Sequence, residues 1–378
     1  MVRRNYLKLG REPLLLGLAV LLVLVFSGCT QTGAVPRGWS GVAVAGDTLY
    51  VGSMQGELVA LNMANGNRRW MAKLESAAPS GGGFGCTPST SGTVAIYGTP
   101  AVAGGLVYVT GYNGMVYAFK VDSGAAAWPA PATLGGPVIG GAVVAAGNIY
   151  FGAADDRVYA LDAASGSKVW EFKTGDKIWG TPVVYGDTLL VGSFDKTLYA
   201  LSLADGSKKW AFPTEGAIVA TPVVVADTVY IGSFDRHFYA LDAADGSLKW
   251  QFMGENWFWA RPLVYNGVIY AANLDGKVYA LEAANGNKVA EFDLGSPVAS
   301  SPVLVGHAVI AVTEAGAVYA LDTATRQMRP LVDLAEEAYA PLAAGDGVVY
   351  LHTQKDDSLK AVNAETGVVQ WNFDLGGK

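Results

Sequence analysis

The side chains of this sequence that could bind a metal ion are few and scattered. Its three histidines fall at unrelated positions of a forty-residue repeat, so they are not expected to form a metal site. Four aspartates do recur at one position of that repeat, and carboxylates are ligands that calcium prefers. Each stands in a turn, however, where an aspartate commonly bonds its own backbone. We therefore predict no metal site among His237, His307, His352, Asp155, Asp195, Asp235 and Asp275.

Aromatic residues and one arginine form a second group that could do chemistry. The segment GENWFWARP, residues 254–262, departs from the repeat and contains Trp257, Trp259 and Arg261. An aromatic ring beside a guanidinium can stack a flat anionic ligand or a sugar, or it can anchor a partner peptide. The alternative, which we favour, is that these side chains fill the centre of the fold as packing. With the residues that align with Trp259, the candidate group at the mouth of a central channel is Trp39, Tyr97, Trp179, Trp257, Trp259 and Arg261.

No recognisable catalytic motif accompanies these residues. The sequence contains no nucleophile elbow, no HExxH pair and no phosphate-binding loop. Its only cysteines are Cys29 and Cys86, and lipidation of Cys29 would leave no internal disulfide. We therefore expect a protein that is not an enzyme and that is stabilised by packing alone.

The first 28 residues have the layout of a secretory signal peptide. Basic residues precede an apolar run of about thirteen residues, 14–26, which is short for a membrane span. Ser27 and Gly28 then lead to Cys29, an arrangement that resembles a bacterial lipobox. We expect a lipoprotein signal peptide over residues 1–28, acylation of Cys29 and a lipidated tether over residues 29–38, with an uncleaved anchor as the alternative.

Thr30, rather than an aspartate, follows the predicted lipidation site. This favours the outer membrane, facing the periplasm, in a host with two membranes, and the cell surface in a host with one. Cleavage would leave 22 basic and 32 acidic residues, a net charge near −10. That balance argues against nucleic acid as a partner, since nucleic-acid binding needs clustered Lys and Arg.

A repeat of about forty residues runs through the rest of the chain. Eight copies begin at residues 50, 108, 150, 190, 230, 270, 310 and 350, and each contains four β-rich runs separated by Gly, Asp or Asn. Repeated four-stranded meanders bury both faces by stacking, and a closed ring leaves the fewest exposed edges. We predict an all-β fold, a single eight-bladed β-propeller of four-stranded antiparallel blades over residues 39–378. Residues 338–375 contain four runs of their own, so the ring is expected to close by packing whole blades.

The most regular element of the repeat is Ala-Leu-Asp-x-Ala-x-Gly-x-x-x-Trp. Six blades carry tryptophan at its last position, whereas Ala290 and Pro330 occupy that position in the other two. A cofactor would not need six equivalent tryptophans on six blades, whereas a joint between neighbouring blades would use them for packing. The predicted docking tryptophans are Trp70, Trp128, Trp170, Trp210, Trp250 and Trp371.

This motif resembles the tryptophan-docking repeat of the quinoprotein, PQQ-like, eight-bladed propellers over residues 39 to about 375. That resemblance implies the fold but not one activity, because the repeat serves dehydrogenases and non-catalytic proteins alike. The quinoprotein dehydrogenases carry two adjacent cysteines and a carboxylate and amide set for calcium. The adjacent cysteines are missing from this sequence.

The lipobox, the short tether and the single propeller resemble the BamB family of outer-membrane assembly lipoproteins. That resemblance implies docking of a β-barrel assembly component through the loops 174–181 and 214–221. Lys177 and Ile178 are the matching candidate docking residues, whereas Ala217 and Val219 replace the family's acidic pair.

The sequence is compatible with three functions. The leading hypothesis is a membrane-anchored, non-enzymatic scaffold in cell-envelope protein assembly, without a cofactor. The alternatives are a dehydrogenase that uses pyrroloquinoline quinone with calcium, and an extracytoplasmic ligand-binding or sensory propeller. An insertion over residues 74–97, which contains Phe84 and Cys86, is either a mobile lid or, as we favour, a tolerated loop.

Overall fold

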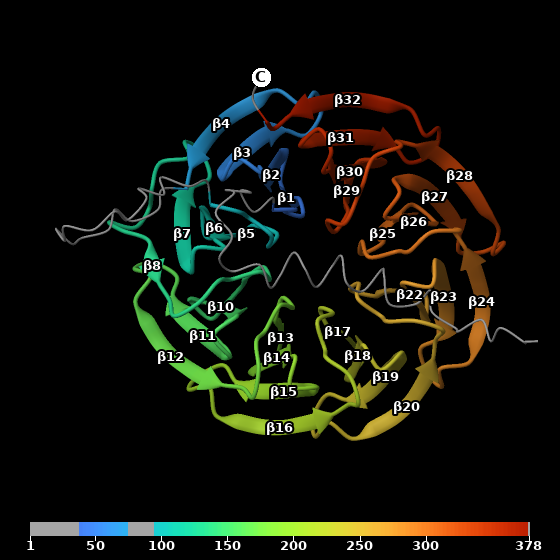
Figure 1. Cartoon of the computed structure of the whole chain (residues 1–378), viewed down its shortest axis with the longest axis horizontal. Coiled ribbons are helices and arrows are strands. Elements are labelled where there is room, and N and C mark those ends of the chain that lie inside the picture. The colour runs from blue at the N-terminus through green and yellow to red at the C-terminus, as the bar shows by residue number, and fades with distance from the viewer. Residues whose placement is uncertain (1–37, 75–93, 377–378) are drawn as a thin grey trace, which may run out of the picture. The chain divides into compact units, whose positions relative to one another are not determined.

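In the computed structural model of the chain, the described residues form thirty-two strands, which are grouped into eight antiparallel sheets. The structure describes residues 38–74 and 94–376. In every sheet the four strands are consecutive in sequence, and the sheets follow one another around a ring (Figure 1). The predicted eight-bladed propeller with four-stranded antiparallel blades is therefore confirmed. We number the blades 1 to 8 in chain order.

The first four blades contain strands β1 to β16. Blade 1 consists of β1 (Ala43–Ala45), β2 (Thr48–Gly52), β3 (Glu57–Asn62) and β4 (Arg68–Lys73). Blade 2 consists of β5 (Ala101–Ala103), β6 (Leu106–Thr110), β7 (Met115–Lys120) and β8 (Ala132–Thr133). Blade 3 consists of β9 (Val143–Ala145), β10 (Asn148–Ala153), β11 (Arg157–Asp162) and β12 (Lys168–Lys173). Blade 4 consists of β13 (Val183–Tyr185), β14 (Thr188–Gly192), β15 (Thr197–Ser202) and β16 (Lys208–Pro213).

The last four blades contain strands β17 to β32. Blade 5 consists of β17 (Val223–Val225), β18 (Thr228–Gly232), β19 (His237–Asp242) and β20 (Leu248–Met253). Blade 6 consists of β21 (Leu263–Tyr265), β22 (Val268–Ala272), β23 (Lys277–Glu282) and β24 (Lys288–Asp293). Blade 7 consists of β25 (Val303–Val305), β26 (Ala308–Val312), β27 (Ala317–Asp322) and β28 (Met328–Asp333). Blade 8 consists of β29 (Ala343–Gly345), β30 (Val348–Thr353), β31 (Ser358–Asn363) and β32 (Val369–Asp374).

Burial along the strands follows from their place in a blade. Strand β18, TVYIG, is buried at every residue because neighbouring blades cover both of its faces. The outer strand β12, KVWEFK, is exposed at Lys168, Val169, Glu171 and Lys173 and covered at Trp170 and Phe172, as expected for a strand with one covered face. Between β17 and β18, Ala226 and Asp227 both have positive φ, which is the geometry that a two-residue hairpin turn needs.

A tryptophan joint connects most neighbouring blades. Trp170 of blade 3 donates its indole Nε1–H to the carbonyl of Leu203 in blade 4, at 2.9 Å. Its ring lies on Gly206, where a Cβ atom would stand 2.6 Å from the ring and where φ is +72°. The other tryptophans with such a bond are Trp70, Trp128, Trp210 and Trp250, which donate to Val121, Ala163, Ala243 and Ala283.

The two joints without tryptophan use arginine instead. Where Ala290 replaces tryptophan, Arg326 takes the place of the usual glycine on the next blade, and its guanidinium donates to the Val289 carbonyl at 3.1 Å. Beside Pro330, Arg329 donates to the Ala364 carbonyl at 3.3 Å, which is the equivalent of the carbonyl that tryptophan bonds elsewhere. A guanidinium therefore makes a hydrogen bond between blades at both of these joints, and beside Pro330 it reaches the same carbonyl position that the indole bonds elsewhere.

The ring closes between two complete blades, as the sequence predicted. Trp371 of blade 8 packs on Gly66 of blade 1, although its indole N–H has no hydrogen-bond partner within the described residues. His352, whose side chain is fully buried, bonds the Ser40 carbonyl through Nδ1 at 3.0 Å and Asp357 through Nε2 at 2.9 Å. Asp357 in turn accepts the backbone N–H of Met54 at 3.0 Å. We call His352, Asp357 and their two partners in blade 1 the closure contact.

Several expectations lie outside the described residues. These are the signal peptide, the lipidation of Cys29, nearly all of the tether, and residues 75–93 of the insertion with Phe84 and Cys86. Within residues 38–74 and 94–376, no helix has the length and apolar character needed to cross a membrane.

Candidate functional site

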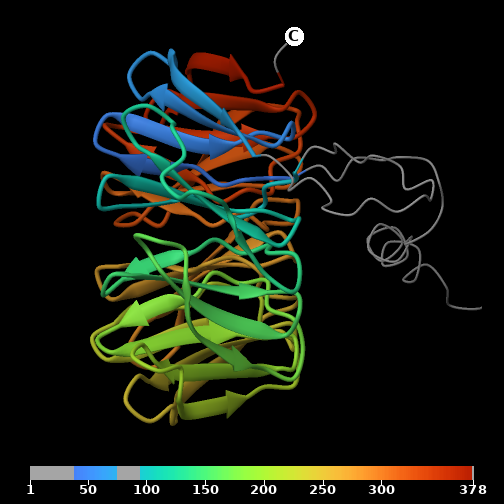
Figure 2. The ribbon, with the colours of Figure 1, turned by 90° about the vertical axis from the view of Figure 1, so that its left-hand side faces the viewer.

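The loops between blades lie at one face of the propeller, which we call the loop face. It is formed by the inter-blade loops 134–142, 174–182, 214–222, 254–262, 294–302 and 334–342, with the turns that join the second and third strand of each blade. Figure 2 shows the blades from the side, with turns and loops at the two ends of the strands. The candidate binding residues of the sequence all belong to this face or to the layer just beneath it.

An aromatic cluster covers blades 4 to 6 on the loop face. We define it as Trp179, Phe194, Phe234, Trp257 and Trp259. Phe234 stacks on Trp257 with ring centroids 4.5 Å apart and on Trp259 at 5.4 Å. Trp179 meets Phe194 edge-on at 4.6 Å and Trp259 at 6.4 Å. All five side chains are half-buried, so they keep accessible ring surface.

Two members of this cluster were missed by sequence reasoning. Phe194 and Phe234 occupy the same turn position in the repeated segments GSFDKT and GSFDRH. That shared position was visible in the sequence, but the contact between a turn and an inter-blade loop is a tertiary feature, since Phe194 meets the loop before its blade and Phe234 meets the loop after its blade. The structure therefore enlarges the predicted aromatic group by two phenylalanines.

The remaining predicted aromatic residues form a separate group near the closure of the ring. Trp39 lies 4.6 Å from Tyr97 and 6.0 Å from Tyr339, measured between ring centroids, and Tyr97 lies 5.4 Å from Tyr112. Burial, together with the neighbouring Tyr112, raises the pKa of Tyr97 to about 12, so its hydroxyl is neutral and can donate a hydrogen bond at physiological pH. The predicted group thus divides into two parts.

The two candidate docking residues of the loop 174–181 have different environments. Lys177 places its ammonium 4.6 Å from the ring centroid of Phe194 and 5.3 Å from that of Trp179, within the range of a cation–π contact. Ile178, in contrast, is fully buried in the core that blades 3 and 4 share. The expectation that Ile178 contacts a partner is therefore corrected: its side chain packs against Gly152 and the neighbouring strands.

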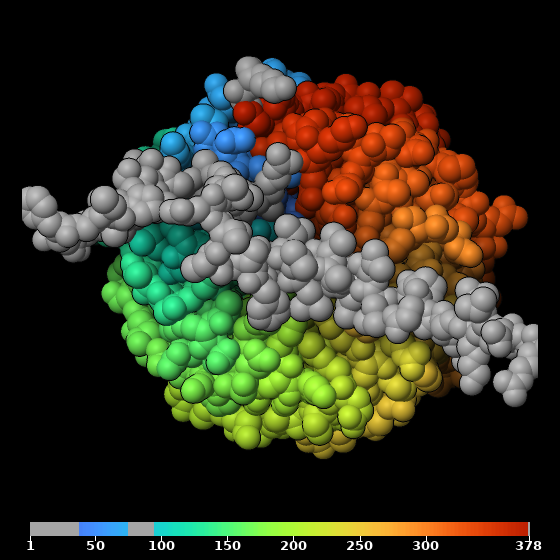
Figure 3. Space-filling model, in the orientation of Figure 1, coloured from blue at the N-terminus to red at the C-terminus, as the bar shows by residue number. Residues whose placement is uncertain are grey.

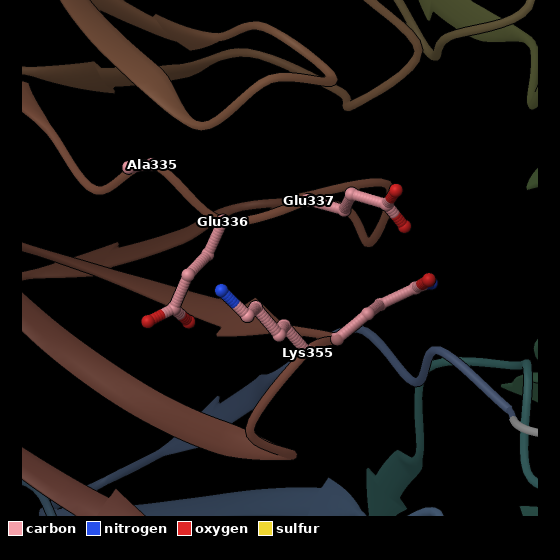
Figure 4. A pocket seen from close by; sticks show the side chains of 5 residues that line it. Ala335, Glu336, Glu337 and Lys355 are labelled. Carbon is pink, nitrogen blue, oxygen red and sulfur yellow. The ribbon is translucent and has the colours of Figure 1, made fainter.

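An acidic region lies on blades 7 and 8 of the loop face. Glu336, Glu337 and Lys355 line a shallow hollow of about 450 Å³ (Figure 4), and Ala335 and Gln354 complete its lining. Burial raises the pKa of the nearby Glu314, and the negative charge of Glu337 raises it further. The loop face is therefore aromatic with a cation over blades 4 to 6 and acidic over blades 7 and 8. Figure 3 shows one face of the molecule in space-filling form, with these blades in green, yellow and orange to red.

Three of the four recurrent aspartates, Asp195, Asp235 and Asp275, bond the backbone of their own turns, as the sequence predicted. Asp155 does not, because one of its carboxylate oxygens accepts the Tyr159 hydroxyl and the other has no partner within the described residues. Asp195 accepts the backbone N–H of Thr197 at 3.0 Å and, through its other oxygen, the Tyr199 hydroxyl at 2.7 Å. Burial and this carboxylate raise the pKa of Tyr199 to about 12. The same pattern of an aspartate and a tyrosine four residues later recurs at Asp155, Asp235 and Asp275.

A calcium-bound quinone has no matching set of ligands around the centre of the ring. The residues two positions before each innermost strand are Gly41, Thr99, Gly141, Thr181, Thr221, Arg261, Ser301 and Pro341, none of which is a carboxylate or an amide. In the part of the chain that the structure describes, no group of three His, Cys, Asp or Glu side chains is arranged to hold a metal ion. These residues do not fit calcium, which prefers six to eight oxygen ligands.

The fold and the loop face define a PQQ-type eight-bladed propeller. The model of the family described as "Outer membrane protein assembly factor BamB" matches residues 30–172, 154–291, 253–329 and 274–378, which together cover most of the chain. The chain therefore belongs to the BamB family. No curated protein sequence matches it significantly.

Two solved structures share the fold. BamB from Moraxella catarrhalis has 19% sequence identity and a TM-score of 0.67, and the alignment covers 87% of this chain and 92% of that one. The computationally designed Ika8 protein has 14% identity and a TM-score of 0.71, with 87% and 97% covered. At such low identity, these likenesses support the architecture and carry no functional residue across.

Proposed function

We propose that this protein is a non-enzymatic scaffold, anchored to a membrane by lipidated Cys29, which acts in cell-envelope protein assembly. Membership of the BamB family supports this role, because the family is described as an outer-membrane protein assembly factor. The sequence also lacks the adjacent cysteines of the quinoprotein dehydrogenases, and its axial residues do not suit calcium.

The observation that carries the proposal is the aromatic cluster with Lys177. Five half-buried rings from three consecutive blades present apolar surface beside one ammonium group. Aromatic side chains bury a large area at a small cost in side-chain entropy, and they dominate the binding energy of protein interfaces. The cluster is our candidate docking surface for a β-barrel assembly component.

Co-purification from the native host tests this surface. Full-length protein, extracted in mild detergent, is expected to recover an outer-membrane β-barrel assembly component. Trp257→Ser should reduce the recovered amount about tenfold or more, because loss of a hot-spot aromatic costs at least about 2 kcal/mol of binding free energy. Val225→Ser is the matched control, since Val225 is also an exposed apolar residue but lies at the opposite end of the innermost strand β17.

Two results would count against the docking surface. One is the recovery of no envelope assembly protein by the wild-type chain. The other is equal recovery by Trp257→Ser and the wild type when both have the same melting temperature. Lys177→Glu is a second variant that leaves the aromatic rings in place and reverses the charge beside them.

The membrane anchor has its own test. Cys29→Ser should remove acylation, and the protein should then move from the membrane fraction to the soluble fraction after cell breakage. Retention of Cys29→Ser in the membrane would instead indicate that residues 14–26 remain as an uncleaved anchor.

A further inference from the structure

A second ring of equivalent residues lies one step below the aromatic residues of the loop face. Each blade contributes the residue two positions before its innermost strand, and we call these eight residues the axial layer: Gly41, Thr99, Gly141, Thr181, Thr221, Arg261, Ser301 and Pro341. Neighbouring members touch across the blade boundaries. A Cβ atom on Gly41 would stand 2.2 Å from the Thr99 hydroxyl, and the Gly141 N–H donates to the Thr181 hydroxyl at 2.8 Å.

Arg261 is the one charged residue of the axial layer. Its backbone N–H donates to the Ser301 hydroxyl on the next blade at 3.1 Å, which holds the residue against blade 7. Its guanidinium, in contrast, has no hydrogen bond or ion pair with any residue of the described chain, although guanidinium carries five donors. Arg69 and Arg157 show the usual alternative, because each contacts a carboxylate, that of Asp47 and that of Glu171.

Arg261 is accessible to solvent and is also surrounded by many protein atoms. Solvent reaches the residue, yet burial among surrounding protein atoms is the one cause that lowers its pKa. No carboxylate counteracts this effect, so the positive charge lies near the centre of the ring without compensation. The guanidinium stays protonated at neutral pH, because its pKa starts far above that range.

Hydroxyl groups flank this charge on both sides. Thr221 of blade 5 precedes Arg261 in the axial layer, and its hydroxyl has no hydrogen bond within the described residues. Ser301 and Thr181 each accept a backbone N–H, which leaves their own O–H protons available for another acceptor. This part of the layer therefore offers a fork of charged donors and several neutral donors, with no carboxylate to compete for them.

We propose that the axial layer is a binding site for a small oxyanion, a phosphate or carboxylate group, which Arg261 holds through paired N–H···O bonds. The guanidinium fork matches the spacing of two oxygens of such a group. The hydroxyls of Thr221 and Ser301 stand on the neighbouring blades, where they add donors to the same ligand. This site is separate from the docking of a partner protein.

Anion titration of the purified full-length protein tests this site. Binding is measured by isothermal calorimetry with inorganic phosphate and with succinate, and the melting temperature is measured in parallel. Sodium chloride keeps the ionic strength constant, because screening alone would otherwise change with the added salt. The two probes separate a preference for phosphate from one for carboxylate, and no partner protein is present.

The proposal predicts saturable binding of at least one probe and a higher melting temperature in its presence. Arg261→Gln should weaken that binding by about tenfold or more, since a charge-assisted hydrogen-bond pair is lost. Thr221→Val, which removes a neutral donor at nearly constant volume, should weaken it by a smaller factor. Lys208→Gln is the matched control: it removes an exposed cation of the outer strand β16, which lies outside the axial layer and the docking surface, so binding should be unchanged.

The proposal is overturned if neither probe binds the wild type saturably, or if Arg261→Gln binds as tightly as the wild type. Equal loss of binding in Lys208→Gln and Arg261→Gln would also overturn it, because this would indicate a general effect of net charge. Should Arg261→Gln fail to fold, Thr221→Val decides, and unchanged binding by that variant contradicts the site. Loss of partner recovery without loss of anion binding would leave this site intact and affect only the docking surface.

Discussion

At the scale of single residues, side chains that are neighbours in the sequence have different environments in the structure. Lys177 and Ile178 are adjacent, yet the ammonium of one lies over aromatic rings and the side chain of the other is fully buried. The four repeated aspartates, which could have suggested calcium, each accept a hydrogen bond from the tyrosine four residues later, and three of them also bond the backbone of their own turns. Whether a side chain can bind a ligand or a partner protein therefore depends on the contacts that it already makes within the fold.

Glu314 gives a prediction of pH dependence at this scale. Burial and the charge of Glu337 raise its pKa in the folded state, so the folded protein holds this proton more tightly than the unfolded chain does. The stabilisation that the Glu314 carboxyl gives is therefore fully present below its pKa in the unfolded chain. It is lost as the pH rises through its pKa in the folded protein. Glu314→Gln should raise the melting temperature at pH 7 and leave it nearly unchanged at about pH 4, where the wild-type carboxyl is protonated.

The control for this prediction is a carboxylate whose folded pKa is lowered. Asp187 is one, because a hydrogen bond from Lys209 and the charge of that lysine hold its pKa below the usual range. Asp187→Asn should not be stabilising at pH 7. Equal melting temperatures of Glu314→Gln and the wild type across pH 4 to 7 would contradict the account of Glu314.

At the scale of elements, the blade and its joint are the repeated unit. Length, turn residues and tryptophan spacing predicted four strands in each blade and the position of each docking tryptophan. The sequence could not predict how blades without tryptophan are joined, because Arg326 and Arg329 reach carbonyls on other blades that no local pattern relates to them. In the same way, the contact of Phe234 with Trp257 depends on which turn lies over which inter-blade loop.

Substitution of a joint tryptophan measures how much the joint contributes to the free energy of unfolding. Trp170→Ala should lower the free energy of unfolding by about 3–5 kcal/mol, since it removes a buried ring from the core between blades 3 and 4. Trp170→Phe should cost less, because the Leu203 carbonyl keeps its hydrogen bond from the Tyr150 hydroxyl at 3.2 Å. Urea denaturation gives both values.

The exposed joint residue Arg329 is the matched control for Trp170. Arg329→Ala removes a similar hydrogen bond to a carbonyl but no buried ring, so its cost should stay below about 1.5 kcal/mol. A Trp170→Ala variant as stable as Arg329→Ala would show that the tryptophans do not hold the blades together.

At the scale of the whole molecule, the ring is closed by side chains and not by a shared sheet. All eight sheets consist of consecutive strands, so the contact between blade 8 and blade 1 rests on packing and on the closure contact. The sequence predicted closure by whole blades because residues 338–375 held four runs. It did not predict the role of His352, because Ser40 lies 312 positions away along the chain.

Removal of the closure contact should loosen one boundary of the ring. His352→Ala removes two buried hydrogen bonds and leaves a cavity, at a cost of about 2–4 kcal/mol. Hydrogen exchange should become faster in β30, β31 and β2, while β18 on the far side of the ring keeps its protection. A uniform increase in exchange over all blades would show that the ring unfolds as one unit and would contradict a local role.

The loop face has two regions of different character, an aromatic one over blades 4 to 6 and an acidic one over blades 7 and 8. A scaffold that docks a partner through the aromatic half is the central claim for this protein. Site-specific photocrosslinking in the native host tests it most directly, with the reactive residue at position 257 and, as control, at position 225. The account predicts a crosslink to an envelope assembly protein from position 257 and none from position 225, whereas the same products from both positions, or none from position 257, would contradict it.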